Sequence, residues 1–84
     1  MKFVYTSTAE EALSRLPRVD QKRIAKKMDF YAEQRDPLRF AKPLVGRGAL
    51  YRFRIGPYRL IFEVTKGTLY ALLIIRRDKA YKEF

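Results

Sequence analysis

The sequence contains neither cysteine nor histidine. Without cysteine, the chain has no disulfide, no thiol nucleophile and no cysteine-ligated zinc. Without histidine, Ser-His-Asp and Cys-His catalysis are excluded, and so are most transition-metal sites. We therefore expect no metal and no small-molecule cofactor, so any chemistry must come from other side chains.

Long apolar runs are also missing. No stretch approaches the roughly 18 apolar residues that a membrane-spanning helix needs. Residues 1–16, MKFVYTSTAEEALSRL, lack the long apolar core of a signal peptide. We therefore expect a cytoplasmic protein that has no membrane partner.

Acidic residues are scarce, because nine Asp and Glu face 19 Lys and Arg and leave a formal net charge of +10. Hydrophobic residues make up 48% of the chain and aromatic residues 14%, which is enough to form a core despite the charge. At 84 residues the chain is expected to be a single domain, residues 1–84. The strong positive charge indicates a polyanionic partner.

The first part of the chain predicts a strand and a helix. Residues 1–6 are mostly strand-favouring types and predict a short edge strand. A capping box fits at residues 7–10 or at residues 8–11, so a helix is expected to begin there. This helix should end at Leu16, because a residue that precedes a proline is pushed out of the helical region.

A second helix is predicted to follow, with Asp20 as its N-cap. It should end near Arg35, because Asp36-Pro37 is a helix-breaking pair. Its apolar stripe, at intervals of three and four, consists of Ile24, Met28 and Tyr31, with Ala25 and Ala32.

Three strands are predicted in the second half, at residues 50–55, 58–64 and 68–75. The turns between them are Gly56-Pro57 and Lys66-Gly67. The fold class is therefore α+β in the order β-α-α-β-β-β, with a small curved antiparallel sheet and the helix pair packed on one face. Among the aromatic residues, Phe30, Tyr31 and Tyr70 are expected in the core.

Arginines gather on one face of these predicted strands. Alternation turns Arg52 and Arg54 away from the core. It turns Arg59 to the same open face, together with Ile61 and Glu63. If Gly56-Pro57 is a two-residue loop, Arg54 lies directly opposite Arg59, where like charges destabilise the sheet by up to about 1 kcal/mol. A bound anion would remove this conflict, and guanidinium groups match phosphate in a bidentate geometry.

The last predicted strand leads into Arg76, Arg77 and Tyr81, which adds cations to the same region. Several converging arginines and a tyrosine favour a phosphate site. Each arginine taken alone is equally well explained as a solvated residue that blocks edge-to-edge aggregation. Lys22 and Lys26 are typical of a solvated helix face that attracts RNA at long range.

Three segments of the chain carry a family resemblance: DQKRIAKKMDFYAEQRDPLRFAKPLVG (20–46), LYRFRIGPYRLIFEV (50–64) and RRDKAYK (76–82). They resemble the RelE/ParE toxin superfamily, and within it the RelE-like mRNA interferases. This resemblance implies a toxin of a type II toxin-antitoxin system, a ribosome-dependent endoribonuclease whose partners are a cognate antitoxin, the ribosome and mRNA. The expected reaction is metal-independent attack of the ribose 2′-OH on the adjacent phosphate in the A site. The alternatives are a ParE-type gyrase inhibitor and a catalytically silent RNA-binding or partner-binding module.

The resemblance also implies roles for individual residues. The catalytic candidates from the resemblance are Arg54, Arg59, Arg77 and Tyr81. The RNA-binding candidates are Arg52, which the resemblance also indicates, and Arg76, Lys22 and Lys26, which are candidates because of their charge and placement. The arginines would stabilise the charge of the transition state, and Tyr81 would act as the base. Some family members have lysine at the positions of Arg52 and Arg54, and arginine cannot replace lysine as a base. Glu63 is a further candidate, either as a base or as an ion-pair partner of the arginines.

Overall fold

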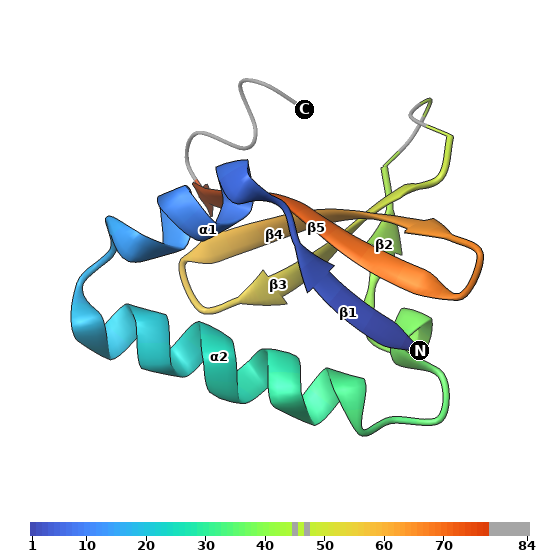
Figure 1. The fold of residues 1–84 in the computed structure, drawn as a ribbon, viewed down its shortest axis with the longest axis horizontal. Coiled ribbons are helices and arrows are strands. Elements are labelled where there is room, and N and C mark those ends of the chain that lie inside the picture. The colour runs from blue at the N-terminus through green and yellow to red at the C-terminus, as the bar shows by residue number, and fades with distance from the viewer. Residues whose placement is uncertain (45, 47, 78–84) are drawn as a thin grey trace.

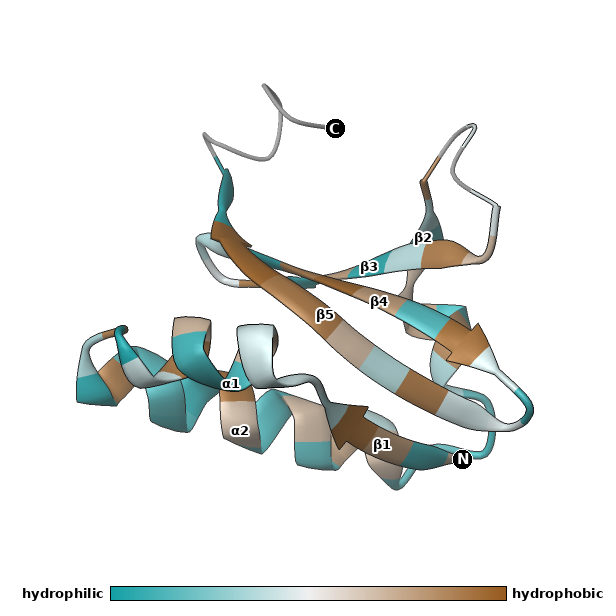
Figure 2. Cartoon of the chain, turned by 45° about the horizontal axis from the view of Figure 1, so that its top comes forward, coloured by the Kyte–Doolittle hydropathy of each residue, from teal (hydrophilic) through white to brown (hydrophobic). Residues whose placement is uncertain are grey.

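The computed structural model describes residues 1–44, 46 and 48–77. Its elements are β1 (Lys2–Tyr5), α1 (Ser7–Ser14), α2 (Arg18–Ala32), a 3-10 helix η1 (Pro37–Phe40), β2 (Lys42–Pro43), β3 (Leu50–Ile55), β4 (Tyr58–Thr65) and β5 (Thr68–Arg76). The strands form one sheet in the order β1-β5-β4-β3-β2 (Figure 1). Both helices lie on the same face of this curved sheet (Figure 2). None of the described helices is long and apolar enough to cross a membrane.

The predicted α+β fold is confirmed, with one change in the sheet. Strands β3, β4 and β5 form the expected antiparallel meander. Strand β1 lies at the edge, as predicted, but it pairs in parallel with β5. The sheet is therefore mixed. The strand that pairs with β1 is the last strand of the meander, which follows the two helices in the sequence. The two-residue strand β2, which pairs with β3, was not predicted.

Both helices begin earlier than the sequence predicted. The Oγ1 atom of Thr6 accepts a hydrogen bond from the backbone N of Ala9 at 3.2 Å, so Thr6 caps α1 and neither predicted capping box forms. Helix α2 follows Pro17, whose fixed φ suits a helix start. Asp20 lies inside the first turn of α2 and is not its cap. Its carboxylate is therefore available for a contact outside the helix.

Replacing Thr6 by alanine is expected to lower the free energy of unfolding by about 1–2 kcal/mol. The hydroxyl of Thr6 both caps α1 and donates a hydrogen bond to the carbonyl oxygen of Ala71 in β5 at 3.0 Å. Urea denaturation followed by circular dichroism measures the change. Thr6→Ser keeps the hydroxyl and should retain most of the stability. A larger loss in Ser7→Ala than in Thr6→Ala would instead support a capping box at residues 7–10.

The core lies between the helices and the sheet. Of the predicted stripe, Ile24, Met28 and Tyr31 are buried, whereas Ala25 and Ala32 are exposed. The ring of Tyr31 stacks on Phe53 with 4.0 Å between centroids, and Phe53 stacks on Phe62 at 4.5 Å. This aromatic stack ties α2 to strands β3 and β4.

Two aromatic residues predicted for the core lie at the surface. Phe30 is 42% exposed and Tyr70 is 37% exposed. Phe30 is not on the stripe that faces the sheet, and Tyr70 alternates with the buried Leu69 and Ala71. Apolar sequence neighbours were therefore a poor guide to burial at these two positions.

The β3–β4 hairpin is the two-residue loop that the sequence predicted, because Ile55 pairs with Tyr58. Gly56 has a φ of 58°, as a hairpin turn with glycine at the first central position requires. A Cβ at this position would lie 2.9 Å from Nη1 of Arg23 in α2. Glycine therefore also lets α2 approach the hairpin closely.

Candidate functional site

Four of the predicted site arginines lie at the end of the sheet that holds the β3–β4 hairpin. Arg54 is near the end of β3, and Arg59 is near the start of β4. Strand β5 ends beside the hairpin, because the backbone N of Arg77 donates to the carbonyl oxygen of Pro57 at 2.7 Å. We call Arg54, Arg59 and Arg77 the arginine cluster.

Arg54 and Arg59 are direct cross-strand partners, as the sequence predicted. Their Cα atoms are therefore about 4.5–5.5 Å apart, and both side chains leave the sheet on the face away from the helices. Within the described part of the chain, the ion pairs join Glu11 to Arg15 and Asp20 to Arg23, so neither Arg54 nor Arg59 has a carboxylate within 4.0 Å. This unbalanced pair of cations favours a bound anion.

Arg59 is only 2% exposed and is the one buried charged side chain among the described residues. Its Nη1 atom donates to the carbonyl oxygen of Tyr58 at 3.3 Å. Ile61 on the same face is also 2% exposed, so the prediction of an open face is wrong at these two positions. Both lie on β4, the central strand of the sheet, which pairs with β3 on one side and with β5 on the other. A charge is costly to bury without an anionic partner, which makes Arg59 the strongest anion-binding candidate.

Arg76 lies on the opposite face of the sheet from Arg59. It pairs with Tyr58, and its guanidinium carbon is 5.9 Å from the centre of the Tyr58 ring. The cause is a register shift in β5, which leaves Leu72 without a partner in the β4–β5 register. A shift of one residue moves every following side chain to the other face. The β4–β5 bulge therefore separates Arg76 from the Arg54–Arg59 pair.

The remaining predicted site residues are spread over the molecule. Arg52 is half-buried and lies on the same face as Arg54, opposite Ile61. Lys22 and Lys26 are exposed on α2, so the sheet separates them from the Arg54–Arg59 pair. Arg77 is exposed directly after β5. Tyr81 lies outside the described residues.

Glu63 does not join the arginines. Its Oε1 atom accepts a hydrogen bond from the Thr65 hydroxyl at 3.2 Å. It pairs with Leu50 and Tyr70, and it is four residues along β4 from Arg59, which corresponds to about 13 Å. The expectation that Glu63 forms an ion pair with these arginines is therefore wrong within the described structure.

Sequence reasoning missed a polar link between α2 and the hairpin. The Tyr58 hydroxyl donates to Oδ2 of Asp20 at 2.8 Å, and Nη1 of Arg23 lies 3.9 Å from Oδ1 of Asp20. The hydrogen bond to Asp20, burial and the Asp20 charge raise the pKa of Tyr58, while Arg76 opposes this effect. Tyr58 therefore stays protonated near neutral pH. It is a structural donor next to the cluster and a poor general base.

Replacing Tyr58 by phenylalanine is expected to lower the free energy of unfolding by about 1 kcal/mol at pH 7. The raised pKa means that this contribution is fully present below about pH 10 and is lost as pH rises through the folded-state value. The stability difference between the two proteins should therefore shrink above pH 10. Urea unfolding of both proteins at neutral and alkaline pH measures it, with Tyr70→Phe as the control. A difference that stays constant with pH would contradict the Asp20 hydrogen bond.

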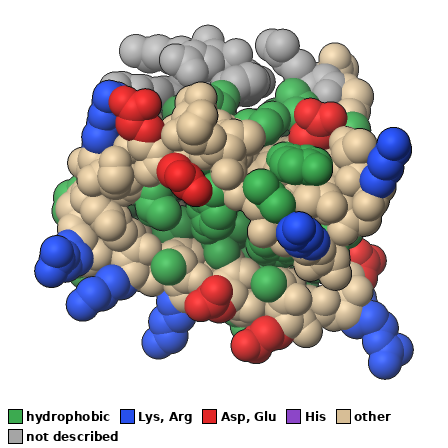
Figure 3. Space-filling view, in the orientation of Figure 1, with side chains coloured by type: hydrophobic (Ala, Val, Ile, Leu, Met, Phe, Trp, Pro, Cys, Tyr) green, Lys and Arg blue, Asp and Glu red, His purple; other side chains and the backbone are tan. Residues whose placement is uncertain are grey.

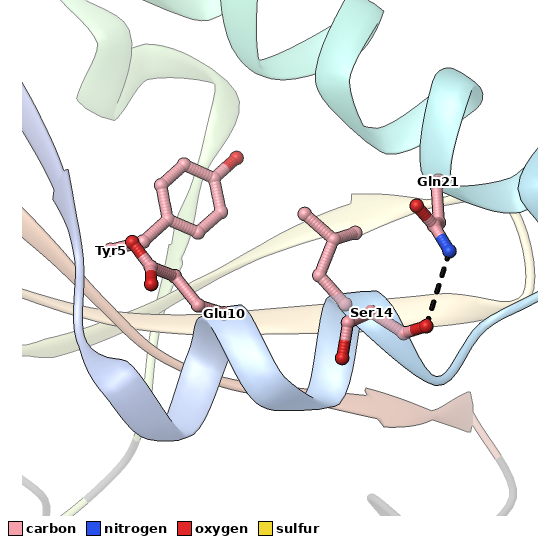
Figure 4. Close-up of a pocket in the computed structure, with 5 residues that line it drawn as sticks. Tyr5, Glu10, Ser14 and Gln21 are labelled. Carbon is pink, nitrogen blue, oxygen red and sulfur yellow. Dashed lines mark hydrogen bonds between the residues drawn. The ribbon is translucent and has the colours of Figure 1, made fainter.

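A separate hollow of about 310 Å³ lies between α1, α2 and β1 (Figures 3 and 4). Gln21 closes one end by donating to the carbonyl oxygen of Ser14 at 3.3 Å, and Tyr5 lines the other end. Burial, and secondarily the charge of Asp29, raise the pKa of Tyr5. The hollow lies on the helix side of the sheet and is not part of the Arg54–Arg59 site. Among the described residues, no three or more His, Cys, Asp or Glu side chains lie together in a group that could hold a metal ion.

A family model described as the ParE toxin of the type II toxin-antitoxin system, parDE, matches residues 3–81. This match covers nearly the whole chain, including the arginine cluster. No curated protein sequence matches significantly.

Solved structures are similar over almost the full length. The RelB-RelE antitoxin-toxin complex from Methanococcus jannaschii has a TM-score of 0.77 at 23% identity, covering 96% of this chain and 98% of that one. The RelBE2 toxin-antitoxin complex from Mycobacterium tuberculosis has a TM-score of 0.74 at 28% identity, covering 90% of each chain. The chromosomal ParDE system from P. aeruginosa has a TM-score of 0.57 at 18% identity, covering 90% of this chain and 95% of that one. These matches confirm the RelE-like fold that the resemblance implied.

Proposed function

Because the chain belongs to the ParE toxin family of type II toxin-antitoxin systems, we propose that it is a toxin that cuts messenger RNA in the ribosomal A site. Two observations support RNA cleavage over other activities of this superfamily. The fold is closer to the RelE structures, with TM-scores of 0.77 and 0.74, than to the ParDE structure at 0.57. The arginine cluster also has the chemistry of a phosphodiester site.

The single observation that carries the proposal is the buried guanidinium of Arg59 opposite Arg54. A phosphodiester supplies the anion that the described structure does not place there. Guanidinium groups hold phosphate oxygens in a fixed bidentate geometry and remain charged at any relevant pH. Such groups stabilise a reaction in which negative charge grows on the phosphoryl oxygens.

The proposed reaction needs no metal. A base removes the proton of the ribose 2′-OH, and the 2′-oxygen bonds to phosphorus while the bond from phosphorus to the 5′-oxygen breaks. The leaving 5′-oxygen takes a proton, so the products are a cyclic phosphate and a free 5′-OH. Arg54, Arg59 and Arg77 are proposed to stabilise the transition state, and Tyr81 to act as the base. Tyr58 is unsuited to that role because its hydroxyl is bound to Asp20.

The basic surface also suggests how the toxin meets its partners. Arg52, Arg76, Lys22 and Lys26 are proposed to attract RNA, which agrees with a net charge of +10. A cognate antitoxin with an acidic segment is proposed to neutralise the toxin by covering the arginine cluster. The M. jannaschii and M. tuberculosis structures are both toxin-antitoxin complexes. Ribosomes and mRNA place the proposed activity in the cytoplasm.

A second candidate function is ParE-type inhibition of gyrase, which the family match itself favours. In that case the basic surface would contact a protein, and growth arrest would leave mRNA intact. A third outcome is an RNA-binding module without catalysis. The three functions differ in their products: cleaved mRNA, trapped gyrase-DNA complexes, or RNA that is bound but intact. One set of assays therefore separates them.

The decisive experiment is primer extension on a defined mRNA, with purified ribosomes and the purified chain. Cuts should appear only in the A-site codon and only when ribosomes are present. The downstream fragment should accept a labelled phosphate from polynucleotide kinase without prior dephosphorylation, because its end is a 5′-OH. If the mRNA stays intact, a second assay with gyrase and DNA follows. Trapped gyrase-DNA cleavage complexes in that assay would establish the ParE mode. Ribosome binding without cleavage would establish the catalytically silent module.

A further inference from the structure

Two phenylalanines stand side by side on the surface, far from the arginine cluster. Phe30 lies near the end of α2 and is 42% exposed, and Phe40 ends η1 and is 46% exposed. Their ring centroids are 5.5 Å apart with an interplanar angle of 77°, so the edge of one ring meets the face of the other. We call Phe30 and Phe40 the aromatic patch.

The aromatic patch is braced from beneath by the core. The Tyr31 ring lies 5.7 Å from Phe30 and 5.6 Å from Phe40, and it stacks in turn on Phe53. The 3-10 helix that carries Phe40 is capped by Asp36, whose Oδ1 atom accepts from the backbone N of Leu38 at 3.2 Å. The rings are thus held in place before any partner binds, which lowers the entropy cost of binding.

Cations surround the aromatic patch. The Nζ atom of Lys27 lies 5.3 Å from the centre of the Phe30 ring. Arg35 and Arg39, both exposed, line a hollow of about 420 Å³ beside Phe40. The other residues that line this hollow are Gln34 and Asp36. The Phe40 ring is therefore bordered by polar and charged groups, which are cationic except for the carboxylate of Asp36.

We infer that the aromatic patch binds an unpaired nucleotide of RNA, whose base stacks on Phe40 while its phosphate contacts Arg35 or Arg39. Stacking on an exposed aromatic ring beside cations is the chemistry by which proteins hold single-stranded nucleic acid. A protein partner would anchor an apolar side chain, but four of the five residues that line this hollow are polar or charged. A nucleobase has an apolar face and a polar edge, so it fits both parts of the hollow.

This contact is separate from the proposed cleavage site. Asp20 near the start of α2 is bonded to Tyr58 beside the arginine cluster, whereas Phe30 lies further along the same helix, about 15 Å away. Figure 1 shows the β3–β4 hairpin near the start of α2, and the green η1 near its end. A single nucleotide cannot reach both places. The aromatic patch would therefore hold a second nucleotide, from the mRNA or from ribosomal RNA.

Phe40→Leu tests the inference, because leucine keeps the apolar contact with Tyr31 but removes the flat ring. We expect it to weaken binding to a fluorescently labelled RNA hairpin with an unpaired loop by about tenfold or more. Binding to a fully paired RNA duplex should not change. Phe40→Tyr keeps the ring and should bind the loop like the wild type. Val19→Ala shortens an exposed apolar side chain elsewhere on α2 and serves as the matched control.

Fluorescence anisotropy measures these affinities, and circular dichroism shows that each variant is folded. Weaker binding of Phe40→Leu to ribosomes without mRNA assigns the nucleotide to ribosomal RNA. A loss seen only with programmed ribosomes assigns it to the mRNA. Wild-type affinity of Phe40→Leu for the hairpin loop overturns the inference. If Phe40→Leu binds the hairpin loop with wild-type affinity but fails to bind the cognate antitoxin, the aromatic patch is a protein interface.

The hairpin assay does not depend on cleavage, so its result is separable from that of the proposed function. A chain that cuts no mRNA but loses loop binding through Phe40→Leu would refute the proposed function and keep the aromatic patch as an RNA site. If the wild type cuts mRNA and Phe40→Leu binds the loop as tightly as the wild type does, the proposed function stands and the aromatic patch is not an RNA site.

Discussion

Replacing Arg59 by alanine is expected to reduce the rate of A-site cleavage by about 10²–10³-fold while the chain stays folded. The Arg59 guanidinium is buried opposite Arg54, and no described carboxylate lies within 4.0 Å of it. In the proposed reaction, its removal takes away a fixed positive charge from the phosphoryl oxygens as they become more negative. Cleavage of programmed mRNA measured at several enzyme concentrations, together with circular dichroism, tests this expectation.

Two further variants separate charge from geometry at this position. Arg59→Lys keeps a positive charge but loses the planar fork, so its activity should fall between that of the wild type and that of Arg59→Ala. Arg18→Ala removes an exposed arginine at the start of α2 and should leave cleavage unchanged. If Arg59→Ala cleaved mRNA at the wild-type rate, Arg59 would have no part in the reaction.

Replacing Phe53 by alanine is expected to lower the free energy of unfolding by about 3–5 kcal/mol. Phe53 is 0% exposed and stacks between Tyr31 and Phe62, so its loss leaves a cavity where α2 meets the sheet. Small domains have only about 5–15 kcal/mol of net stability. The variant should therefore be close to unfolding at physiological temperature, and urea titration measures the shift.

Phe30→Ala is the matched control for Phe53→Ala, because it removes the same kind of side chain from the aromatic patch at the surface. Phe30 is 42% exposed, so the expected loss is about 1–2 kcal/mol, smaller than that of Phe53→Ala. Equal losses in the two variants would mean that the Tyr31–Phe53–Phe62 stack does not carry the core.

Local sequence patterns predicted the part of the site that lies on β3 and β4. Strand β3 spans the predicted residues 50–55, because alternation is regular there and Gly56-Pro57 leaves a two-residue loop as the simplest turn. With that loop, the opposition of Arg54 and Arg59 follows from counting. A hairpin fixes its own register, so the bounds of β3, the start of β4 and the Arg54–Arg59 pair could be predicted, whereas β4 ends at Thr65, one residue later than predicted.

Contacts between distant segments could not be predicted in this way. Strand β5 is apolar on both faces, so its sequence does not reveal the bulge that turns Arg76 toward Tyr58. The hydrogen bond between Asp20 and Tyr58 joins residues that are 38 positions apart. An aspartate near a helix start is usually a cap, and Pro17 had already fixed that start.

Burial was the other property that the sequence did not reveal. Alternation predicted the correct face for Arg59, but the face is closed where Arg59 lies. The exposure of Phe30 follows from its position off the Ile24–Met28–Tyr31 stripe, since the stripe residues already fill the contact with the sheet. In both cases the decisive quantity is how neighbouring elements cover a position, which a single sequence does not contain.

The parallel pairing of β1 with β5 also sets the order in which this protein can fold during its own synthesis. Residues 2–5 leave the ribosome before the other described strands, but their partner strand consists of residues 68–76. The helices and the β3–β4 hairpin can form from contacts that are close in sequence, whereas the β1–β5 ladder must wait for the last strand. The complete sheet, with the end of β5 beside the hairpin, therefore exists only after residues 68–76 have left the ribosome that made them.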